Sequence, residues 1–218
     1  MKIATWNIER LNKSTTKNQL IIDCLTKINA DILILTETNE VINLGNTYQC
    51  FHSSKLEESY YKEGERRVSI YSKYDFIGGI KTYRADTSIC VKINTPLGDL
   101  AVYGTIIGTH GNRNESFIAD LDKQLIDFDR IANSNNFCIS GDLNMTFADN
   151  YYYTKEGREK LNASFEQLKL LNLTANIPEN IDHIVLSKTF VGIKQPKIEI
   201  WNSDKILSDH IGVSIELI

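Results

Sequence analysis

Short segments rich in Ile, Val, Tyr and Thr recur along the chain, and each is bounded by Asn, Asp or Gly. This pattern predicts many short β-strands. The predicted strands cover residues 2–8, 31–36, 48–52, 68–72, 88–94, 100–108, 136–140, 182–187, 197–201 and 211–217.

Helical periodicity is confined to a few stretches. Apolar residues keep a helical spacing from Leu20 to Ile28, from Phe117 to Phe128, and within residues 156–171. Many strands with few helices favour two sheets packed face to face, with the helices on their outer faces. Only residues 2–36 give a clear strand–helix–strand unit, so a purely parallel doubly wound sheet is disfavoured.

The length of 218 residues predicts a single domain, residues 1–218, because no repeat, low-complexity tract or Gly/Ser/Pro linker divides the chain. Its 42% hydrophobic and 24% charged content excludes disordered and fibrous proteins. Lys and Arg total 24 against 28 Asp and Glu, which gives a formal charge of -4. A basic nucleic-acid coat protein is therefore excluded, but an enzyme that brings a metal cation to a phosphate is not.

The cysteines predict neither a zinc site nor a disulfide framework. Cys24, Cys50, Cys90 and Cys138 are widely spaced, form no C-x-x-C pair, and stand among apolar or β-prone residues. The N-terminal residues turn polar too soon for a signal peptide, and no apolar run approaches the length of a membrane span. We therefore expect buried, reduced thiols in a soluble cytoplasmic protein.

Polar side chains gather at the ends of the predicted strands. They follow three strands and precede two others, and they comprise Asn7, Glu9, Glu37, Asp142, Asn144, Asp182, Asp209 and His210. Because the C-end of one strand and the N-end of its antiparallel neighbour lie at one edge, we expect these residues to converge on a single rim. Asp142 and Asn144, two apart in an extended segment, should point the same way, with Leu143 in the core.

The carboxylates gathered at this edge would repel one another unless a cation neutralised their charge. Hard oxygen ligands without thiolates suit Mg²⁺ or Mn²⁺ rather than a structural zinc ion. A magnesium ion held by one or two carboxylates, with several waters retained, is suited to phosphate chemistry. The metal would also supply the positive charge that this acidic chain lacks.

At these residues the chain resembles the endonuclease/exonuclease/phosphatase superfamily, which includes apurinic endonucleases and deoxyribonuclease I. The matching blocks are Thr5-Trp6-Asn7-Ile8-Glu9, Ile34-Leu35-Thr36-Glu37-Thr38, Val68-Ser69-Ile70-Tyr71-Ser72-Lys73, Gly141-Asp142-Leu143-Asn144, Ile181-Asp182-His183-Ile184 and Leu207-Ser208-Asp209-His210. Each block alone is weak, but together they stand in the family's order from residue 5 to residue 210. The resemblance implies an α/β fold, a four-layered α-β-β-α sandwich with mixed, mostly antiparallel sheets and the site at one end.

The resemblance also implies roles for the metal and water sites. Glu37 matches the family's main metal-ligand glutamate, Asn7 the asparagine that orients this site, and Asp209 an acidic residue near the metal. Asp142 matches the aspartate that orients or deprotonates the attacking water. Asn144 matches the asparagine that stabilises charge on the pentavalent phosphate.

The phosphate contacts are implied in the same way. His210 matches the histidine that contacts the phosphate, and Asp182 matches the aspartate that polarises it. Whether Asp142 or His210 removes the proton stays open. His110, in a loosely matched block, is our candidate for a further histidine or tyrosine that touches the phosphate in relatives.

Some polar and aromatic residues have competing interpretations. Arg113 is a candidate phosphate contact, although loop arginines are commonly just solvated. Tyr151 belongs either to a packed loop, which we favour, or to a base-stacking lip beside the site. Trp6 and Trp201 are expected in the core. His183 is expected to face away from the side of Asp182 and to be structural.

The sequence thus favours a Mg²⁺- or Mn²⁺-dependent phosphoesterase, and foremost a nuclease that hydrolyses DNA or RNA by in-line attack of water. One alternative is a phosphatase or phosphodiesterase acting on nucleotides, inositol phosphates or lipid headgroups. Another is a non-catalytic binding module. The sequence does not decide among these substrates, between endo and exo action, or on an oligomeric state.

Overall fold

The computed structural model describes residues 1–11, 16–55 and 61–218. Its strands are β1 (Lys2–Asn7), β2 (Ile32–Asn39), β3 (Gln49–His52), β4 (Glu65–Ser72), β5 (Phe76–Ile80), β6 (Ser88–Thr95), β7 (Gly98–Ile106), β8 (Phe137–Asp142), β9 (Leu170–Asn172), β10 (Asp182–Ser187), β11 (Pro196–Trp201) and β12 (Gly212–Leu217). Its helices are α1 (Thr16–Ile28), α2 (Ser116–Ala132), α3 (Lys155–Gln167) and the short α4 (Lys188–Val191).

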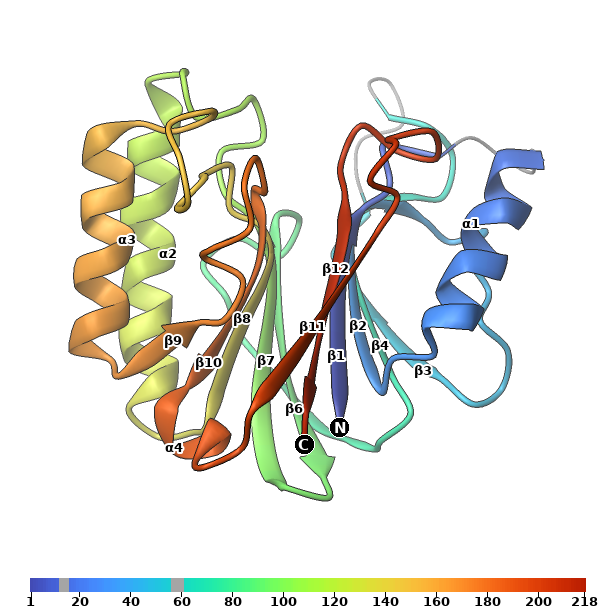
Figure 1. The fold of residues 1–218 in the computed structure, drawn as a ribbon, viewed down its shortest axis with the longest axis horizontal. Coiled ribbons are helices and arrows are strands. Elements are labelled where there is room, and N and C mark those ends of the chain that lie inside the picture. The colour runs from blue at the N-terminus through green and yellow to red at the C-terminus, as the bar shows by residue number, and fades with distance from the viewer. Residues whose placement is uncertain (12–15, 56–60) are drawn as a thin grey trace.

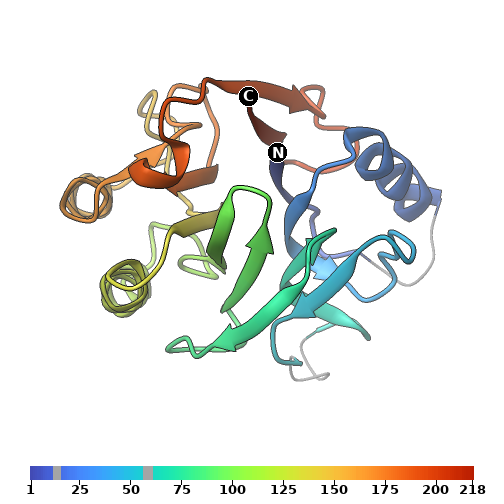
Figure 2. The same cartoon turned by 90° about the horizontal axis from the view of Figure 1, so that it is seen from below.

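Within these residues the strands form two six-stranded sheets that pack face to face. One sheet has the order β11-β12-β1-β2-β4-β3, and the other has the order β5-β6-β7-β8-β10-β9. Helix α1 covers the outer face of the first sheet, while α2 and α3 cover the outer face of the second (Figures 1 and 2). The predicted α-β-β-α sandwich is therefore confirmed.

Both sheets are mixed and mostly antiparallel, as expected. Each contains one parallel pair among its described strands, β1 with β2 and β7 with β8. The second pair is linked by α2, so the fold has a second strand–helix–strand unit that the sequence pattern did not reveal. A loop stands between the end of β7 at Ile106 and the start of α2 at Ser116, so the strand and the helix are not adjacent in the sequence.

Two short strands escaped prediction, and one helix is shorter than expected. Strand β5 is an edge strand with a bulge between Phe76 and Gly78, and its two glycines carry little strand preference. Helix α3 ends at Gln167 instead of continuing to residue 171. Lys169 adopts a left-handed φ of 54°, and the next three residues pair with β10 as β9, so tertiary pairing overrides the helical spacing.

Three apolar layers hold the sandwich together. Ile34 and Val102 belong to the layer between the sheets, Phe117 and Phe128 to the layer beneath α2 and α3, and Trp6 to the layer beneath α1. Trp6 and Trp201 are buried, as expected, and they meet edge to face with ring centroids 6.0 Å apart. Such pairs contribute about 0.5–1.5 kcal/mol beyond the area they bury.

The cysteines are free thiols, of which Cys90 and Cys138 are buried and Cys24 and Cys50 only half-buried. The two half-buried thiols differ from the expectation that all would be buried. No helix in the described part of the chain has the length and apolar character needed to cross a membrane.

Gly104 lies at a point of close approach between the two sheets. A methyl group added at this position on β7 would lie 2.8 Å from Val68 Cγ1 and 3.2 Å from Ile70 Cγ1, both on β4. These distances are shorter than side-chain contacts normally allow, and neither partner is a flexible chain end. The glycine therefore sets the spacing between the layers.

We expect Gly104→Ala to lower the free energy of unfolding by about 1–3 kcal/mol, the usual effect of overpacking a core. Gly78→Ala is the matched control, because a methyl group there meets no atom within 4 Å. Urea unfolding of both variants measures the difference. Equal stabilities for the two variants would contradict this account of the interface.

Candidate active site

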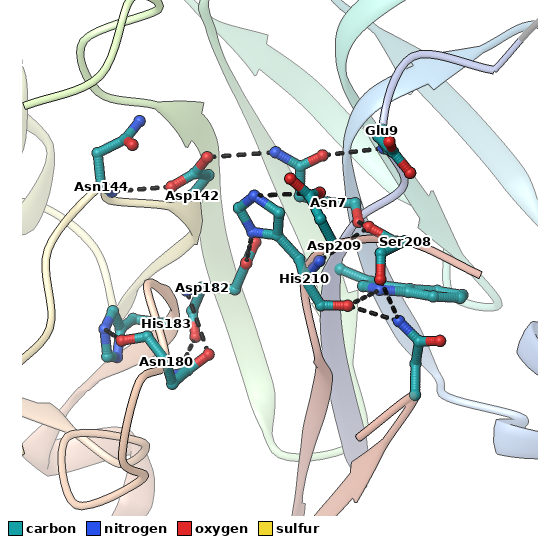
Figure 3. A network of polar contacts seen from close by, with 12 residues as sticks. Asn7, Glu9, Asp142, Asn144, Asn180, Asp182, His183, Ser208, Asp209 and His210 are labelled. Carbon is teal, nitrogen blue, oxygen red and sulfur yellow. Dashed lines mark hydrogen bonds and ion pairs between the residues drawn. The ribbon is translucent and has the colours of Figure 1, made fainter. Parts of the chain in front are cut away.

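Asn7 and Asp142 connect the two sheets at one end of the sandwich. They are the last residues of β1 and β8, and Asn7 Nδ2 donates a hydrogen bond to Asp142 Oδ2 at 3.2 Å (Figure 3). Asn7 Oδ1 accepts the backbone N–H of Glu9 at 3.0 Å, so the amide can turn only its NH₂ group toward Asp142. Both side chains are buried, and the bond is therefore shielded from water.

The position of Asp142 depends on the glycine before it. Gly141 has a φ of +130°, and a methyl group there would lie 2.1 Å from the carbonyl oxygen of Thr105 on β7. Only glycine permits this conformation at such close range. Strand β8 can therefore lie against β7 right up to its final carboxylate.

Asp142 and Asn144 are joined by a turn and not by an extended segment. Strand β8 ends at Asp142, Asn144 adopts a left-handed φ of 50°, and its backbone N–H donates to Asp142 Oδ1 at 2.8 Å. The Asn144 Nδ2 group donates to the carbonyl oxygens of Ile107, at 2.9 Å, and Gly108, at 3.4 Å. The expected two-residue alternation is thus wrong here, although Leu143 is buried as predicted.

Asp182 and His210 form a close pair beside Asp142. Asp182 opens β10 and stands directly opposite Asp142 in the antiparallel register. Its Oδ2 atom lies 2.6 Å from His210 Nδ1, whereas Oδ1 is buried and has no hydrogen-bond partner among the described residues. The short contact fixes the ring with Nδ1–H donating to the carboxylate, which leaves Nε2 to face other groups.

The loop before β12 holds His210 through contacts with β1. Ser208 Oγ donates to the carbonyl oxygen of Asn7 at 2.7 Å and accepts the backbone N–H of His210 at 3.1 Å. The carbonyl oxygen of His210 accepts Trp6 Nε1–H at 3.0 Å and Asn202 Nδ2–H at 2.7 Å. The positioning roles of Ser208 and Asn202 were not predicted, although a serine two residues before the histidine is a common turn signal.

Burial and charge shift the acid–base properties of this cluster. Burial raises the pKa of Asp142 to about 7, and the opposed Asp182 carboxylate adds to the rise while the His210 charge opposes it. For His210, burial lowers the pKa, but the charge and hydrogen bond of Asp182 outweigh it and raise the pKa to about 10. The cluster therefore holds an imidazolium ion between carboxylates at neutral pH.

Glu37 lies within β2 in an unusual backbone conformation. Its φ of 47° is left-handed, and its carbonyl oxygen accepts the backbone N–H of Arg10 at 2.8 Å. Burial raises the pKa of its carboxyl group, while hydrogen bonding from Asn7 and the charges of His210 and Arg10 lower it in part. These interactions place the Glu37 carboxylate beside the cluster of Asn7 and His210.

Asp209 lies at the outer edge of the same cluster. Its side chain is 71% exposed, and its Oδ1 atom is 3.8 Å from His210 Nε2 (Figure 3). Its negative charge also raises the pKa of Glu37, so the two carboxylates repel each other across the site.

Left-handed backbone conformations concentrate around this cluster. The φ angle is 56° at Glu9, 51° at Arg10, 47° at Glu37 and 50° at Asn144. Each such conformation at a residue other than glycine costs about 1–3 kcal/mol and persists only where the surrounding structure imposes it. The strain is typical of a functional site and gives no signal in the sequence.

The carboxylates of Glu37 and Asp209 are the donors best suited to a divalent cation. No group of three or more His, Cys, Asp or Glu side chains within the described ranges is close enough to hold an ion. A Mg²⁺ ion, however, is commonly held by one or two carboxylates and several waters. Glu37 and Asp209, with Asn7 orienting Glu37, fit that donor set, and their mutual repulsion would be relieved by a cation.

The remaining predicted site residues line one of two pockets or contact a residue that does. Tyr151 lines a pocket of about 280 Å³ together with Asn144, Asp182, Asp209 and His210. Arg113 lies over the ring of Tyr152, another wall of this pocket, at 5.8 Å. His110 lines a separate hollow on the far side of Gly108.

His183 is a structural residue, as expected. It is fully buried, its Nε2 lies 2.9 Å from the carbonyl oxygen of Met145 and 3.1 Å from that of Asn180, and its Nδ1 accepts Thr174 Oγ1–H at 3.0 Å. The two carbonyl partners require a proton on Nε2, and Nδ1 carries no proton where it accepts the Thr174 hydroxyl, so the ring is neutral. Burial lowers the pKa of His183 to about 4.

Comparisons with known proteins relate this geometry to a family and to several structures. The model of the Endonuclease/Exonuclease/phosphatase family matches residues 4–210. An AP endonuclease from Archaeoglobus fulgidus superposes with a TM-score of 0.72 at 15% identity, covering 100% of this chain and 99% of that one. A comparison with curated protein sequences gives no match.

Other structures share the fold at similar identity. The endonuclease domain of TRAS1, a telomere-specific non-LTR retrotransposon, has a TM-score of 0.70 at 13% identity, covering 99% of this chain and 97% of that one. A humanised D. rerio TDP2 has a TM-score of 0.68 at 13% identity, with the same coverage of 99% and 97%.

We expect protonation of His183 to make stability depend on pH. Between the ordinary histidine pKa of 6.5 and about 4, the unfolded chain binds a proton that the folded chain excludes. Stability therefore falls with falling pH in this window, by up to about 1.4 kcal/mol per pH unit. His183→Gln removes this contribution.

Urea unfolding of both proteins from pH 7.5 to pH 4.5 tests this expectation. The stability difference between the wild type and the variant should shrink as the pH falls below about 6.5, the ordinary histidine value. A difference that stays constant over the whole range would show that His183 is not a buried neutral group.

Proposed function

The chain belongs to the endonuclease/exonuclease/phosphatase family, and from this premise we propose that it is a divalent-metal-dependent nuclease that hydrolyses phosphodiester bonds in nucleic acid. Members of this family are hydrolases that act on phosphoesters and generally use divalent metal ions. The endonucleases with the same fold act on nucleic acid, as their names state, and this supports a nuclease over other phosphoesterases.

The meeting of Asp142, Asp182 and His210 is the observation that carries the proposal. The residues come from two strands and a loop that are far apart in the sequence, and two of them, Asp182 and His210, line a pocket. A purely structural cluster would have no reason to oppose two buried carboxylates in register, because that arrangement is unfavourable. The imidazolium ion of His210 offsets the repulsion between the two carboxylates, and a catalytic role explains why the chain keeps them there.

Glu37 and Asp209 would hold the divalent ion, with Asn7 orienting Glu37. When bound, such an ion polarises a phosphoryl oxygen and neutralises charge on the leaving group. The raised pKa of Glu37 supports this assignment, because burial and the nearby Asp209 leave its carboxylate short of positive charge.

In this proposal Asp142 accepts a proton from the attacking water. One of its oxygens accepts Asn7 Nδ2–H and the other accepts the backbone N–H of Asn144, so the carboxylate is held in one orientation. His210 cannot accept a proton while Asp182 holds it as the imidazolium ion. We therefore assign to His210 the stabilisation of negative charge on the phosphate, through Nε2.

Asp142→Asn and His210→Gln should each lower kcat by at least about 10²-fold, the scale typical of acid–base groups. Supercoiled plasmid, RNA, abasic duplex and small phosphate esters are assayed in parallel, with Mg²⁺ or Mn²⁺ and then with EDTA. Asp129→Asn is the matched control, since Asp129 is exposed on α2 and outside the centre.

The outcomes separate the candidate functions. Hydrolysis of polynucleotides that EDTA abolishes supports the nuclease, and hydrolysis of small esters alone would transfer the assignment to a phosphatase or small-molecule phosphodiesterase. No EDTA-sensitive activity on any ester would leave a binding module. Unchanged turnover in either centre variant would contradict the roles assigned here.

Glu37→Gln should weaken metal binding, and thermal unfolding can measure this effect without an activity assay. An ion that binds only the folded protein stabilises it by about 2.7 kcal/mol at a hundred times its Kd. We therefore expect Mn²⁺ to raise the Tm of the wild type and to have little effect on Glu37→Gln. Equal shifts in the two proteins would exclude Glu37 as a ligand.

A further inference from the structure

A second hollow adjoins the proposed catalytic centre and is so far without a role. It has a volume of about 490 Å³ and lies between β4 of one sheet and α2 beside the other. We call it the cationic hollow, and its charged walls are Arg67, Arg84, Lys123 and Asp120, with His110 at its edge. Its aromatic walls are Tyr61 and Tyr83.

The charge of the hollow is opposite to that of the whole chain. Three permanent cations face a single carboxylate among its walls, although the chain has a net charge of -4. Arg84 is held by Asp86 through two contacts of 3.0 and 2.9 Å, so its charge is partly balanced. Lys123 is exposed and has no ion pair in the part of the chain that the structure describes.

Arg67 is held in place but incompletely satisfied. Its guanidinium lies over the ring of Tyr61 at 4.9 Å, and its Nη2 contacts the Tyr61 hydroxyl. Its Nε–H is buried and has no hydrogen-bond partner among the described residues. The Tyr61 ring holds the guanidinium in one orientation, so its charge has a fixed place in the wall of the hollow, where it attracts an anionic ligand.

Gly108 forms the boundary between the hollow and the catalytic centre. Its carbonyl oxygen accepts Asn144 Nδ2–H at 3.4 Å on one side, and its N–H donates to Asp120 Oδ2 at 2.7 Å on the other. The loop that follows contributes Thr109 and His110 to the hollow. A ligand in the hollow would therefore lie next to a phosphate bound at the centre.

We propose that the cationic hollow binds the phosphate backbone of a nucleic-acid strand beside the bond that is cleaved. The inference rests on the proposed nuclease function and adds to it a second site, which holds the strand next to the bond that is cleaved. Lys123 and Arg67 contact a neighbouring phosphate, and the ring of Tyr83, which is 36% exposed, offers a face on which a base stacks. A small phosphate ester has no group that reaches this hollow.

The hollow favours a nucleic-acid strand over a membrane surface. Membrane-surface binding requires exposed apolar side chains that insert into the bilayer beside the basic residues, whereas the cations of this hollow are accompanied by tyrosines. Cations together with aromatic side chains suit single-stranded nucleic acid, because the cations contact its phosphates and the rings stack on its bases.

Binding of a fluorescein-labelled single-stranded oligonucleotide in EDTA tests the proposal without cleavage. Fluorescence anisotropy gives the Kd of the wild type, Lys123→Gln and Arg67→Gln over a series of salt concentrations. Each variant should bind more weakly, and the slope of log K against log salt should fall by about 1 for each cation removed. Lys27→Gln, an exposed lysine at the end of α1 on the opposite outer layer, is the matched control and should bind as the wild type does.

The outcomes distinguish this inference from the proposed function. Wild-type binding and salt slope in Lys123→Gln, whose exposed side chain is not needed for folding, would overturn the inference. The inference would also be overturned if Lys123→Gln lost binding to phosphatidylinositol vesicles but kept its affinity for the oligonucleotide. Failure of the wild type to cleave any of the polynucleotides assayed above with Mg²⁺ or Mn²⁺ would instead refute the nuclease function.

Discussion

The antiparallel pairing of β8 with β10 sets the constraint on which the site depends. It places the carboxylates of Asp142 and Asp182 opposite each other, both buried, and that arrangement is unfavourable unless a positive charge lies between them. His210 provides that charge through its 2.6 Å contact with Asp182. The loop before β12 must therefore close over the end of the sandwich, and its contacts with Trp6 and Asn7 are the means by which it does so.

Much of this arrangement could be predicted from the sequence. Many short segments rich in Ile, Val, Tyr and Thr, with few helical stretches, indicated two packed sheets, and polar residues at strand ends indicated that these residues meet at one edge. The blocks around Asn7, Asp142 and His210 then pointed to a family and to an order of residues along the chain. Such patterns are readable because strand pairing and burial act on every residue of an element in the same way.

The parts that could not be predicted depend on single conformations or on distant partners. Glu37 adopts a left-handed φ that no local pattern encodes, and the turn at Asn144 breaks an alternation that the neighbouring strand obeys. Strand β9 forms because β10 lies beside it, against the helical spacing of its leucines. The cationic hollow joins Arg67 of β4 to Lys123 of α2, which share no sequence pattern.

The place of β1 within its sheet has a consequence for how the protein is made. This strand lies between β2, its parallel neighbour, and β12, which is synthesised after all the other strands described here. Until the ribosome has released β12, β1 has an open edge and His210 has no anchored loop. A nascent chain that still lacks β12, or one truncated before it, should therefore be incompletely folded and should lack the anchored His210 on which the proposed chemistry depends. The long sequence separation of this pairing also suggests that its closure is a late and slow step of folding.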